Sequence, residues 1–434
     1  MTVEMILPID RALVESLAKH NDEPQWLTQF RLQALEKASS LPLPYLEKTK
    51  IEKWNLNEYG QFKSSSKVEK IEDLPSHIKD LLETSGEDSG QLVMHNSSTS
   101  FHQLSASLAE QGVIFTDLVT AAREHEDLVK KHLMTAVKVE ENRLTALHAA
   151  LFNNGIFLYI PRNVQVEIPL QALLVADDGE ALVSPHILIV ADENSAVKYV
   201  DHVATMHEHE TVHNGIIEVI AKNGAHVAFS SVRNLGAQVT DVTYRRAIVE
   251  KDAKIEWVLG EMSYGNIMSD TTSILKGNGS FSDAKVVCVG TNSQKLNVTT
   301  RAVHFGRSSD SDMVTRAVMR DEATAIFNGI TKIEKGATHA NGEQTERVLM
   351  LSPKARGDAN PMLLIDEDEV TAGHAASAGQ VNKEQVYYLM SRGISREEAT
   401  KLIIYGFLEP VVSEIPIKQV EEQLSSLVER KLGQ

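Results

Sequence analysis

The sequence contains a single cysteine, Cys288, among 434 residues. One cysteine cannot form an internal disulfide, nor can it build a cysteine-rich zinc or iron–sulphur site within one chain. This usage fits a reducing compartment, so we expect a cytoplasmic protein. The neighbours of Cys288 in AKVVCVG are small and apolar, and the sequence therefore predicts a buried thiol rather than a reactive thiolate.

Positive charge, aromatic side chains and long apolar runs are also scarce. Lys and Arg number 43 against 60 Asp and Glu, and the formal net charge of −17 argues against nucleic acid or an anionic membrane as the main partner. Aromatic residues make up only 5%, which is low for a protein that grips sugars by stacking. No apolar run approaches the ~18 residues of a membrane-spanning helix. The first residues also lack the pattern of a signal peptide.

Several catalytic motifs are missing. The chain has no G-x-x-x-x-G-K-[ST], so we expect no nucleotide hydrolysis by a P-loop. It has no G-x-S-x-G and no H-E-x-x-H either. The sequence thus offers no support for an enzyme of these classes.

The patterns that are present divide the chain into three regions. Residues 1–150 carry apolar side chains every three or four positions and predict a mainly helical domain. Residues 151–380 alternate short β-branched runs with Gly, Asn and Asp, which predicts strands and tight turns. Residues 381–434 are helical again, and Ser395 with Glu398 forms a capping box at the start of one helix.

Polar corners recur through the strand region with a period near 28 residues. The separations between their central small residues are 29, 28, 27 and 57, the last spanning two periods with a weaker corner at 306–313. These central residues are Ala196, Ala225, Ala253, Ser280 and Ala337. A short period made only of strands and turns is typical of a β-solenoid, whose stacked strands bury a continuous core. A large two-sheet β-sandwich is the alternative.

Three histidines in MHEHETVH are candidate metal ligands. In an extended strand His207, His209 and His213 would share one face, and three imidazoles can bind a metal. No distant fourth ligand is evident in the sequence. We therefore favour a solvated strand edge or loop.

The stretch TAGHAASAG, residues 371–379, surrounds His374 with small side chains. A lone histidine beside glycine is more often structural than a ligand. This one, however, lies where the predicted solenoid ends and the helices begin. The last strand of a solenoid has unpaired backbone groups, so the region is a candidate subunit interface. In contrast, we interpret His339 as a polar corner residue and the acidic run at 366–369 as a solvated turn.

Three C-terminal stretches carry distinctive patterns. They are P-x-L-x-I-x-x-x-x-V at Pro361–Val370, Y-Y-L-x-S-R-G-I at Tyr387–Ile394 and E-A-x-x-L-I-I-x-G-F at Glu398–Phe407. With NGITKIEKGATHANGEQTERVLMLSPKA upstream and KTKIEKWNLNEY near the start, they resemble the SufB/SufD family of iron–sulphur cluster assembly proteins. The resemblance spans most of the chain and is strongest over its last hundred or so residues.

Within that family the chain is similar to the SufD branch rather than the SufB branch. SufB-type chains are richer in cysteine and usually read H-E-A where this chain has His374, Ala375 and Ala376. Many SufD chains carry a cysteine where this one has Ala372, and a glycine where it has Ala375. The departure leaves His374 as the only strong ligand in the motif.

The resemblance implies a fold, partners and a site. The implied fold is a right-handed parallel β-helix flanked by N-terminal and C-terminal helical domains. The implied role is a scaffold that is not an enzyme, pairs with SufB through the β-helix end and docks the ATPase SufC through the C-terminal helices. Tyr405 and Phe407 match the SufC-docking region, and His374 matches the family histidine, an iron or cluster ligand.

The same resemblance implies that the isolated chain holds no cofactor stably. Iron or an iron–sulphur cluster would be bound transiently at the SufB interface, and a homodimer is one of the two states left open for the isolated chain. The alternative from the residues is a stand-alone β-helix enzyme acting on acidic polysaccharide, suggested by the solenoid and the histidines at 207–213. We rank it second because an acidic chain repels a polyanion.

Overall fold

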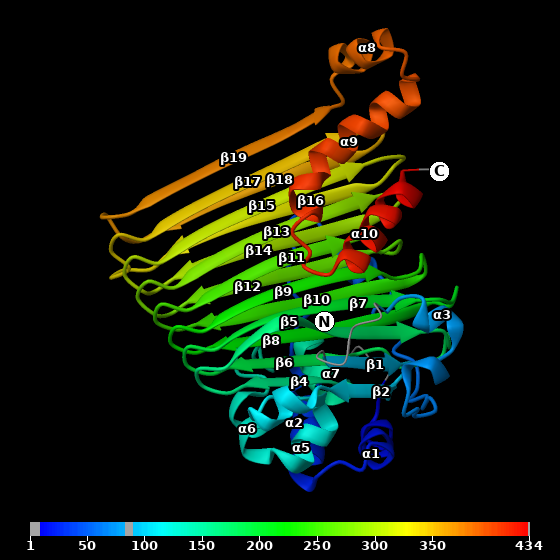
Figure 1. Cartoon of the computed structure of the whole chain (residues 1–434), viewed down its shortest axis with the longest axis vertical. Coiled ribbons are helices and arrows are strands. Elements are labelled where there is room, and N and C mark those ends of the chain that lie inside the picture. Colours follow the sequence, from blue (N-terminus) through cyan, green and yellow to red (C-terminus); the bar gives the residue numbers. More distant parts are fainter. Residues whose placement is uncertain (1–8, 83–89, 433–434) are drawn as a thin grey trace.

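The computed structural model describes residues 9–82 and 90–432, and a β-solenoid forms its centre (Figure 1). Sixteen strands from β4 to β19, two per turn, make eight turns. Successive strands alternate between two sheets, which we call sheet 1 (order β19-β17-β15-β13-β11-β9-β7-β5-β1-β2) and sheet 2 (order β18-β16-β14-β12-β10-β8-β6-β4-β3). Strands β4 to β19 pair in parallel, whereas β2 and β3 pair antiparallel with β1 and β4. The predicted solenoid is therefore confirmed.

The strands of the solenoid are mostly about ten residues long. In chain order they are β4 (Gly155–Ile160), β5 (Gln165–Ala176), β6 (His186–Ala191), β7 (Ala196–Thr205), β8 (Thr211–Ala221), β9 (His226–Asn234), β10 (Val239–Val249), β11 (Lys254–Glu261), β12 (Ile267–Leu275), β13 (Phe281–Gly290), β14 (Lys295–His304), β15 (Asp310–Met319), β16 (Thr324–Ile333), β17 (Asn341–Met350), β18 (Arg356–Ile365) and β19 (Thr371–Gln380).

Alternation along each strand builds the core. In β15 the odd-numbered residues from 311 to 317 are buried and the even-numbered residues from 310 to 316 are half-buried, because every second side chain points between the two sheets. Stacking in register lines these inward side chains up in columns. In one column Tyr199 stacks on Phe229, which meets Trp257 edge to face, with ring centroids 5.2 and 5.1 Å apart. Such aromatic contacts add to the area that the column buries.

The corners confirm a repeat but change its alignment. Pairing of sheet 1 strands spaces equivalent residues 27 to 31 apart, as in Ala196, His226, Lys254 and Phe281. Ala225, Ala253 and Ser280 do occupy equivalent corners. The residue equivalent to Ala225 is Ser195 rather than Ala196, however, and in the later corner it is Ala340 rather than Ala337. The predicted alignment differs from the structure because the spacing between equivalent corners varies by up to four residues.

Several corners contain a residue in the left-handed region. Asn194, Asp252 and His339 have φ of 56°, 55° and 62°, and Gly224 and Gly279 have φ of 69° and 68°. Asn and Asp tolerate this conformation better than most side chains, and glycine adopts it freely. His339 is thus a corner residue, as predicted.

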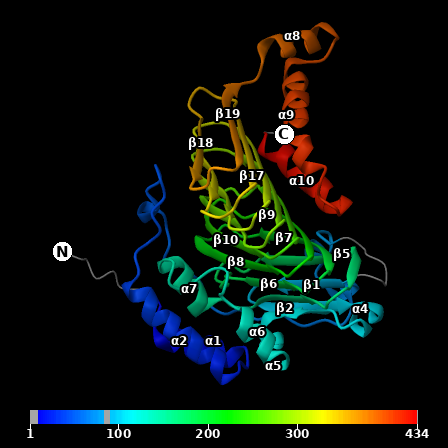
Figure 2. The same ribbon diagram turned by 90° about the vertical axis from the view of Figure 1, so that its left-hand side faces the viewer.

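Helices and three early strands cover the first turns (Figures 1 and 2). The elements before β4 are α1 (Arg11–His20), α2 (Gln25–Ser40), η1 (Ile51–Lys53), η2 (Ile71–Asp73), α3 (Ser76–Lys79), β1 (Gly90–His95), β2 (Ser98–Leu104), α4 (Ala106–Glu110), β3 (Ile114–Asp117), α5 (Leu118–Glu124), α6 (Glu126–His132) and α7 (Arg143–Leu151). β1 pairs with β5, and β3 pairs with β4, so strands from the region predicted to be mainly helical extend both sheets.

Three helices follow the solenoid: α8 (Lys383–Ser391), α9 (Arg396–Val412) and α10 (Lys418–Lys431). The predicted capping box of Ser395 and Glu398 is present at the start of α9. α9 and α10 pack on the outer face of sheet 1 around β9 to β15, whereas α8 projects past β19 (Figure 1). No helix in the described ranges, 9–82 and 90–432, is long and apolar enough to cross a membrane.

Candidate functional site at the open end of the solenoid

His374 lies on β19, the last strand of sheet 1. Its register partner on β17 is Gln344, and that column continues inward through Met313, Ala284 and Trp257. Strands paired in register place these side chains on one face, so His374 faces the space between the sheets. It is nevertheless exposed, because no further turn covers it. His374 is therefore the terminal residue of a core column, at the mouth of the solenoid.

Among residues 9–82 and 90–432, no strand pairs with the outer edge of β19. The N–H of Thr371 donates to the Ala340 carbonyl at 3.0 Å, so in a parallel ladder the odd-numbered residues of β19 bond to β17. The N–H groups of the even-numbered residues, including His374 and Ala376, consequently point away from the sheet. The small residues of β19 let another chain approach this edge closely. The stretch around His374 is thus an unpaired template for a further strand.

A carboxylate that sequence analysis missed lies just behind His374. Glu346 is only 2% exposed, on the inward face of β17, and pairs in register with Ala376. Its Oε1 occupies space left by Gly329, where a Cβ would come within 1.8 Å of that oxygen. Its Oε2 has no hydrogen-bond partner among the described residues. Burial raises the pKa of Glu346 to about 7.

The C-terminal helices carry the most exposed apolar side chains of this end. Tyr387 and Leu402 are 74% and 52% exposed, and Tyr388 and Met390 are exposed as well. A cleft of about 730 Å³ lies between β17, α8 and α9, with Tyr388, Leu402 and Phe407 in its lining. Exposed apolar side chains gathered around a cleft are typical of a surface that binds another protein.

The structure places Tyr405 and Phe407 largely against the solenoid. Both are half-buried at the edge of the apolar cluster that joins α9 and α10 to sheet 1. Arg316 on β15 donates to the Phe407 carbonyl at 2.5 Å, with its guanidinium 5.6 Å from the ring centroid. Burial, together with the nearby Glu429 carboxylate, raises the pKa of Tyr405. These residues fix α9 in place, while Leu402 and Tyr387 present the accessible surface.

The three histidines at 207–213 do not come together. His207 and His209 lie in the loop between β7 and β8, with ring centroids 6.1 Å apart. His213 is buried instead, and its Nδ1 lies 2.9 Å from Asp241. Burial lowers the pKa of His213. The favoured interpretation of a solvated loop thus fits His207 and His209, but it was wrong for His213.

Cys288 is buried, as predicted. It faces the core from β13, and burial raises the pKa of its thiol to about 12. A thiol with such a pKa is protonated at neutral pH and is a poor nucleophile. Cys288 therefore contributes packing.

The donor set of this chain does not complete a metal centre by itself. Within residues 9–82 and 90–432, no group of three histidine, cysteine or carboxylate side chains could hold a metal ion. His374 offers one accessible imidazole at the mouth. Iron and zinc sites need several ligands, so any metal at His374 takes the remaining ligands from another molecule.

Comparison with known families matches nearly the whole chain. Residues 18–172 match the SufBD protein N-terminal region, and residues 174–407 match the SufBD core domain of the SUF system for FeS cluster assembly. The core match begins near the end of β5, covers the last seven turns of the solenoid and ends at Phe407 in α9.

Individual proteins agree with these matches. The iron–sulfur cluster assembly protein SufD of Bacillus subtilis (strain 168) is 48% identical, over 100% of both chains. The iron–sulfur cluster assembly protein SufB of the same organism is 27% identical, over 95% of this chain and 91% of that protein. A SufBD family protein of Staphylococcus epidermidis is 28% identical, over 94% of this chain and 90% of that protein.

Proposed function

Because the chain belongs to the SufB/SufD family of iron–sulphur cluster assembly proteins and is more similar to SufD than to SufB, we propose that it is a non-catalytic scaffold subunit of the Suf assembly complex. It pairs with SufB through the open end of the solenoid and docks the ATPase SufC on its C-terminal helices. In this role it supports iron acquisition and the assembly of a nascent cluster, which is cargo rather than a resident cofactor.

The observation that carries this proposal is the position of His374. It ends a core column, faces the mouth of the solenoid and lies on a strand whose outer backbone groups are unpaired. A partner strand added at this edge would satisfy those groups and enclose the imidazole between two chains. In the absence of SufB, the same edge is available to a second copy of this chain, so the proposal includes a homodimer of the isolated protein.

The same geometry supports a role for His374 as a ligand of iron or of the nascent cluster. A neutral imidazole can bind iron, and His374 is accessible from the mouth. This chain has no cysteine there, since its one cysteine is buried in β13. The thiolates of a cluster therefore come from the partner, while this chain supplies the histidine and a close-fitting edge.

Docking of the ATPase uses the α8–α9 cleft. The chain has no P-loop motif, so the proposal assigns nucleotide hydrolysis to another subunit. The cleft offers exposed Leu402 and Tyr388 beside Phe407, and α9 is held rigidly on sheet 1. Movement of the bound ATPase would consequently be transmitted through α9 toward β17 and β19.

Co-expression with SufB and SufC tests this assignment. Leu402→Glu places a charge on the docking cleft at a position where the wild-type side chain is 52% exposed, and we expect SufC to be lost while SufB remains bound. The matched control is Ile168→Glu, which alters a side chain of similar exposure, 45%, on β5, six strands from β17 in sheet 1. Retention of SufC by Leu402→Glu, or its loss in both variants, would show that the cleft is not the docking surface.

A further inference from the structure

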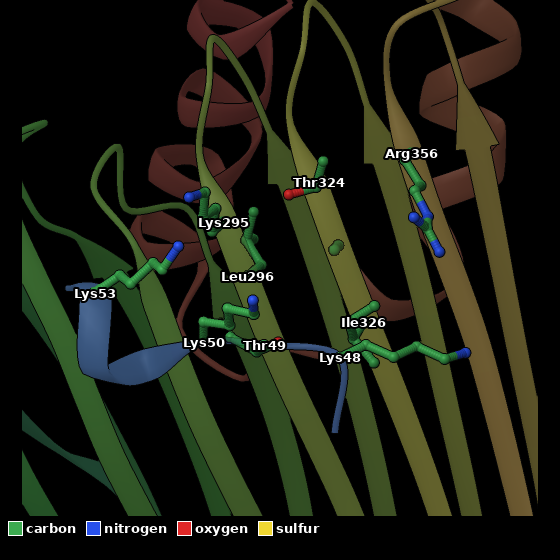
Figure 3. Close-up of a pocket in the computed structure, with 10 residues that line it drawn as sticks. Lys48, Thr49, Lys50, Lys53, Lys295, Leu296, Thr324, Ile326 and Arg356 are labelled. Atoms are coloured by element: carbon green, nitrogen blue, oxygen red, sulfur yellow. The ribbon is translucent and has the colours of Figure 1, made fainter. Parts of the chain in front are cut away.

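A small basic cleft lies on the outer face of sheet 2, over β14, β16 and the start of β18 (Figure 3). A segment of the N-terminal region, residues 45–54, crosses this face, and we call it the strap. The cleft between strap and sheet has a volume of about 300 Å³. Its floor is formed by outward side chains of β16, Thr324 and Ile326. The cations around it are Lys48, Lys50, Lys53, Lys295 and Arg356.

The strap is fixed on the sheet by polar contacts. The Nδ2 of Asn297 donates to Thr49 Oγ1 at 2.8 Å, and the Nδ2 of Asn360 donates to Glu47 Oε2 at 3.2 Å. Ile51 and Trp54 are buried in the apolar cluster that joins the N-terminal region to the solenoid. Held in this way, the strap presents its lysines around the cleft, as Figure 3 shows.

The positive charge in the cleft is only partly neutralised. Asp358 forms ion pairs with Arg356 at 2.6 Å and with Lys48 at 3.6 Å. Over the described part of the chain, no carboxylate pairs with Lys50, Lys53 or Lys295 within 4 Å. Three uncompensated ammonium groups around one cleft are an unusual feature in a chain whose net charge is −17. Their mutual repulsion is relieved when an anion binds between them.

A second cavity adjoins the first. Lys53 and Lys295 line both, and the neighbouring cavity has a volume of about 570 Å³. Its lining is rich in side-chain amides, including Asn55, Gln238 and Asn266. Amides both donate and accept hydrogen bonds, which suits a polar ring or sugar. The two cavities together offer a charged end and a hydrogen-bonding end.

We propose that the basic cleft binds a phosphate-bearing small molecule, with its phosphates among Lys50, Lys53 and Lys295 and its remainder in the amide-lined cavity. This site is separate from the proposed scaffold function and does not depend on it. Lysine ammonium groups bind phosphate as point charges. A small molecule fits better than a nucleic acid, because the cleft is short and the surrounding acidic surface repels an extended polyanion.

Titration calorimetry of the full-length chain with inorganic pyrophosphate at low ionic strength tests the proposal. We expect saturable binding that weakens with added salt, and a loss of at least about tenfold in affinity for the double variant Lys50→Glu/Lys53→Glu. The conservative pair Lys50→Arg/Lys53→Arg should retain binding. The matched control, Lys251→Glu/Lys335→Glu, makes the same change in charge elsewhere. These lysines lie in the corners after β10 and β16, whereas the cleft lies at the starts of the sheet 2 strands. We expect the control to change the affinity by less than about twofold.

Three results would overturn the assignment. They are the absence of saturable binding, an unchanged affinity in Lys50→Glu/Lys53→Glu, and an equal loss of affinity in the control pair. The last result would mean that the anion responds to the overall charge of the protein rather than to the cleft. A hexaglutamate peptide that binds more tightly than pyrophosphate would overturn the preference for phosphate. ADP, added without magnesium, probes the second cavity. Tighter binding than pyrophosphate supports that part of the proposal, and weaker binding removes it.

Discussion

The two ends of the solenoid differ in how far other elements of the chain cover them. At the first end, helices, early strands and a buried polar network cover the sheets (Figure 2). At the last end, β18 and β19 are the outermost strands, and much of β19 is exposed. A single solenoid chain needs only to avoid aggregation at its ends. The difference fits the proposed function, in which the first end serves stability and the last end receives a partner.

The covered end depends on one buried carboxylate. Glu218 on β8 accepts from the N–H groups of Met134, Ala136 and Val137 at 2.5, 2.6 and 3.0 Å. It also lies 3.2 Å from the Nε2 of His186. One side chain thereby fixes the segment between α6 and α7 on the solenoid.

His186 links this carboxylate to α7. Its Nδ1 lies 3.0 Å from the Nε2 of His148, and the Nδ1 of His148 donates to the Asn214 carbonyl at 2.8 Å. His148 therefore presents its unprotonated Nε2 to the Nδ1 of His186, which connects α7 to β6. Burial holds the pKa of His148 well below its usual range, which keeps that ring neutral.

The largest expected effect is the loss of the covered end. Glu218→Ala leaves three buried N–H groups without their acceptor, and we expect the free energy of unfolding to fall by about 3–5 kcal/mol. Urea denaturation followed by circular dichroism measures this change. The control is Glu343→Ala, which removes an exposed carboxylate from β17 near the open end and should change stability by less than about 0.5 kcal/mol. Similar effects of the two substitutions would erase the contrast between the ends.

The next effect concerns the free edge. Ala376→Pro removes an N–H that faces away from β17, so the isolated chain should keep its melting temperature while binding of SufB weakens by at least about tenfold. Ala375→Pro, one residue earlier, removes an N–H of the β17 ladder and should lower the melting temperature. Pull-down with SufB and thermal melting of both variants distinguish the two outcomes. Normal SufB binding by Ala376→Pro would show that the partner does not pair along β19.

A smaller effect comes from the carboxylate behind His374. Burial raises the pKa of Glu346 from 4.5 to about 7, so in this range the folded state binds more protons than the unfolded state. Stability therefore falls as pH rises from about 4.5 to 7, and this loss persists at higher pH. The full shift corresponds to about 3 kcal/mol, and screening by solvent at the open mouth reduces the expected loss to about 1–2 kcal/mol.

Glu346→Gln removes that dependence. We expect the variant to match the wild type near pH 4.5 and to exceed its stability by about 1–2 kcal/mol at pH 8. Denaturation curves at the two pH values test this expectation. A variant less stable than the wild type at pH 8 would mean that the ionised carboxylate has a favourable partner.

The smallest effect on stability is expected at His374 itself. Its side chain is exposed at the mouth, and His374→Ala should change the free energy of unfolding by less than about 0.5 kcal/mol. A loss of several kcal/mol in thermal or urea denaturation would instead make His374 a structural residue. This substitution is therefore suited to a test of function.

The architecture was readable from the sequence because each turn repeats the same local signals. Polar corners at Ala225, Ala253 and Ser280 and β-branched runs between them predicted stacked strands. The early strands β1 to β3 were not predicted, since they are short and their pairing with β4 and β5 depends on contacts distant in sequence. A local sequence pattern does not predict secondary structure that depends on partners distant in the sequence.

The site was only partly readable. Its position between the solenoid and the helices pointed to His374, but the register that turns its side chain toward the mouth required pairing across 30 residues, with Gln344. Glu346 gave no sequence signal, because a glutamate in TERVLML reads as an exposed strand residue until Gly329 is placed opposite it. Likewise, spacing alone could not show that Phe407 packs on the solenoid while Leu402 faces solvent.

The most direct test of the central claim is cluster assembly in the complete complex. This chain, as wild type or His374→Ala, is co-expressed with SufB and SufC, purified without oxygen and supplied with iron, sulphide and ATP, and cluster formation is followed by visible absorption and Mössbauer spectroscopy. The account predicts that the His374→Ala complex assembles with normal stoichiometry and stability but forms little cluster. Cluster formation at the wild-type rate in that complex would contradict it.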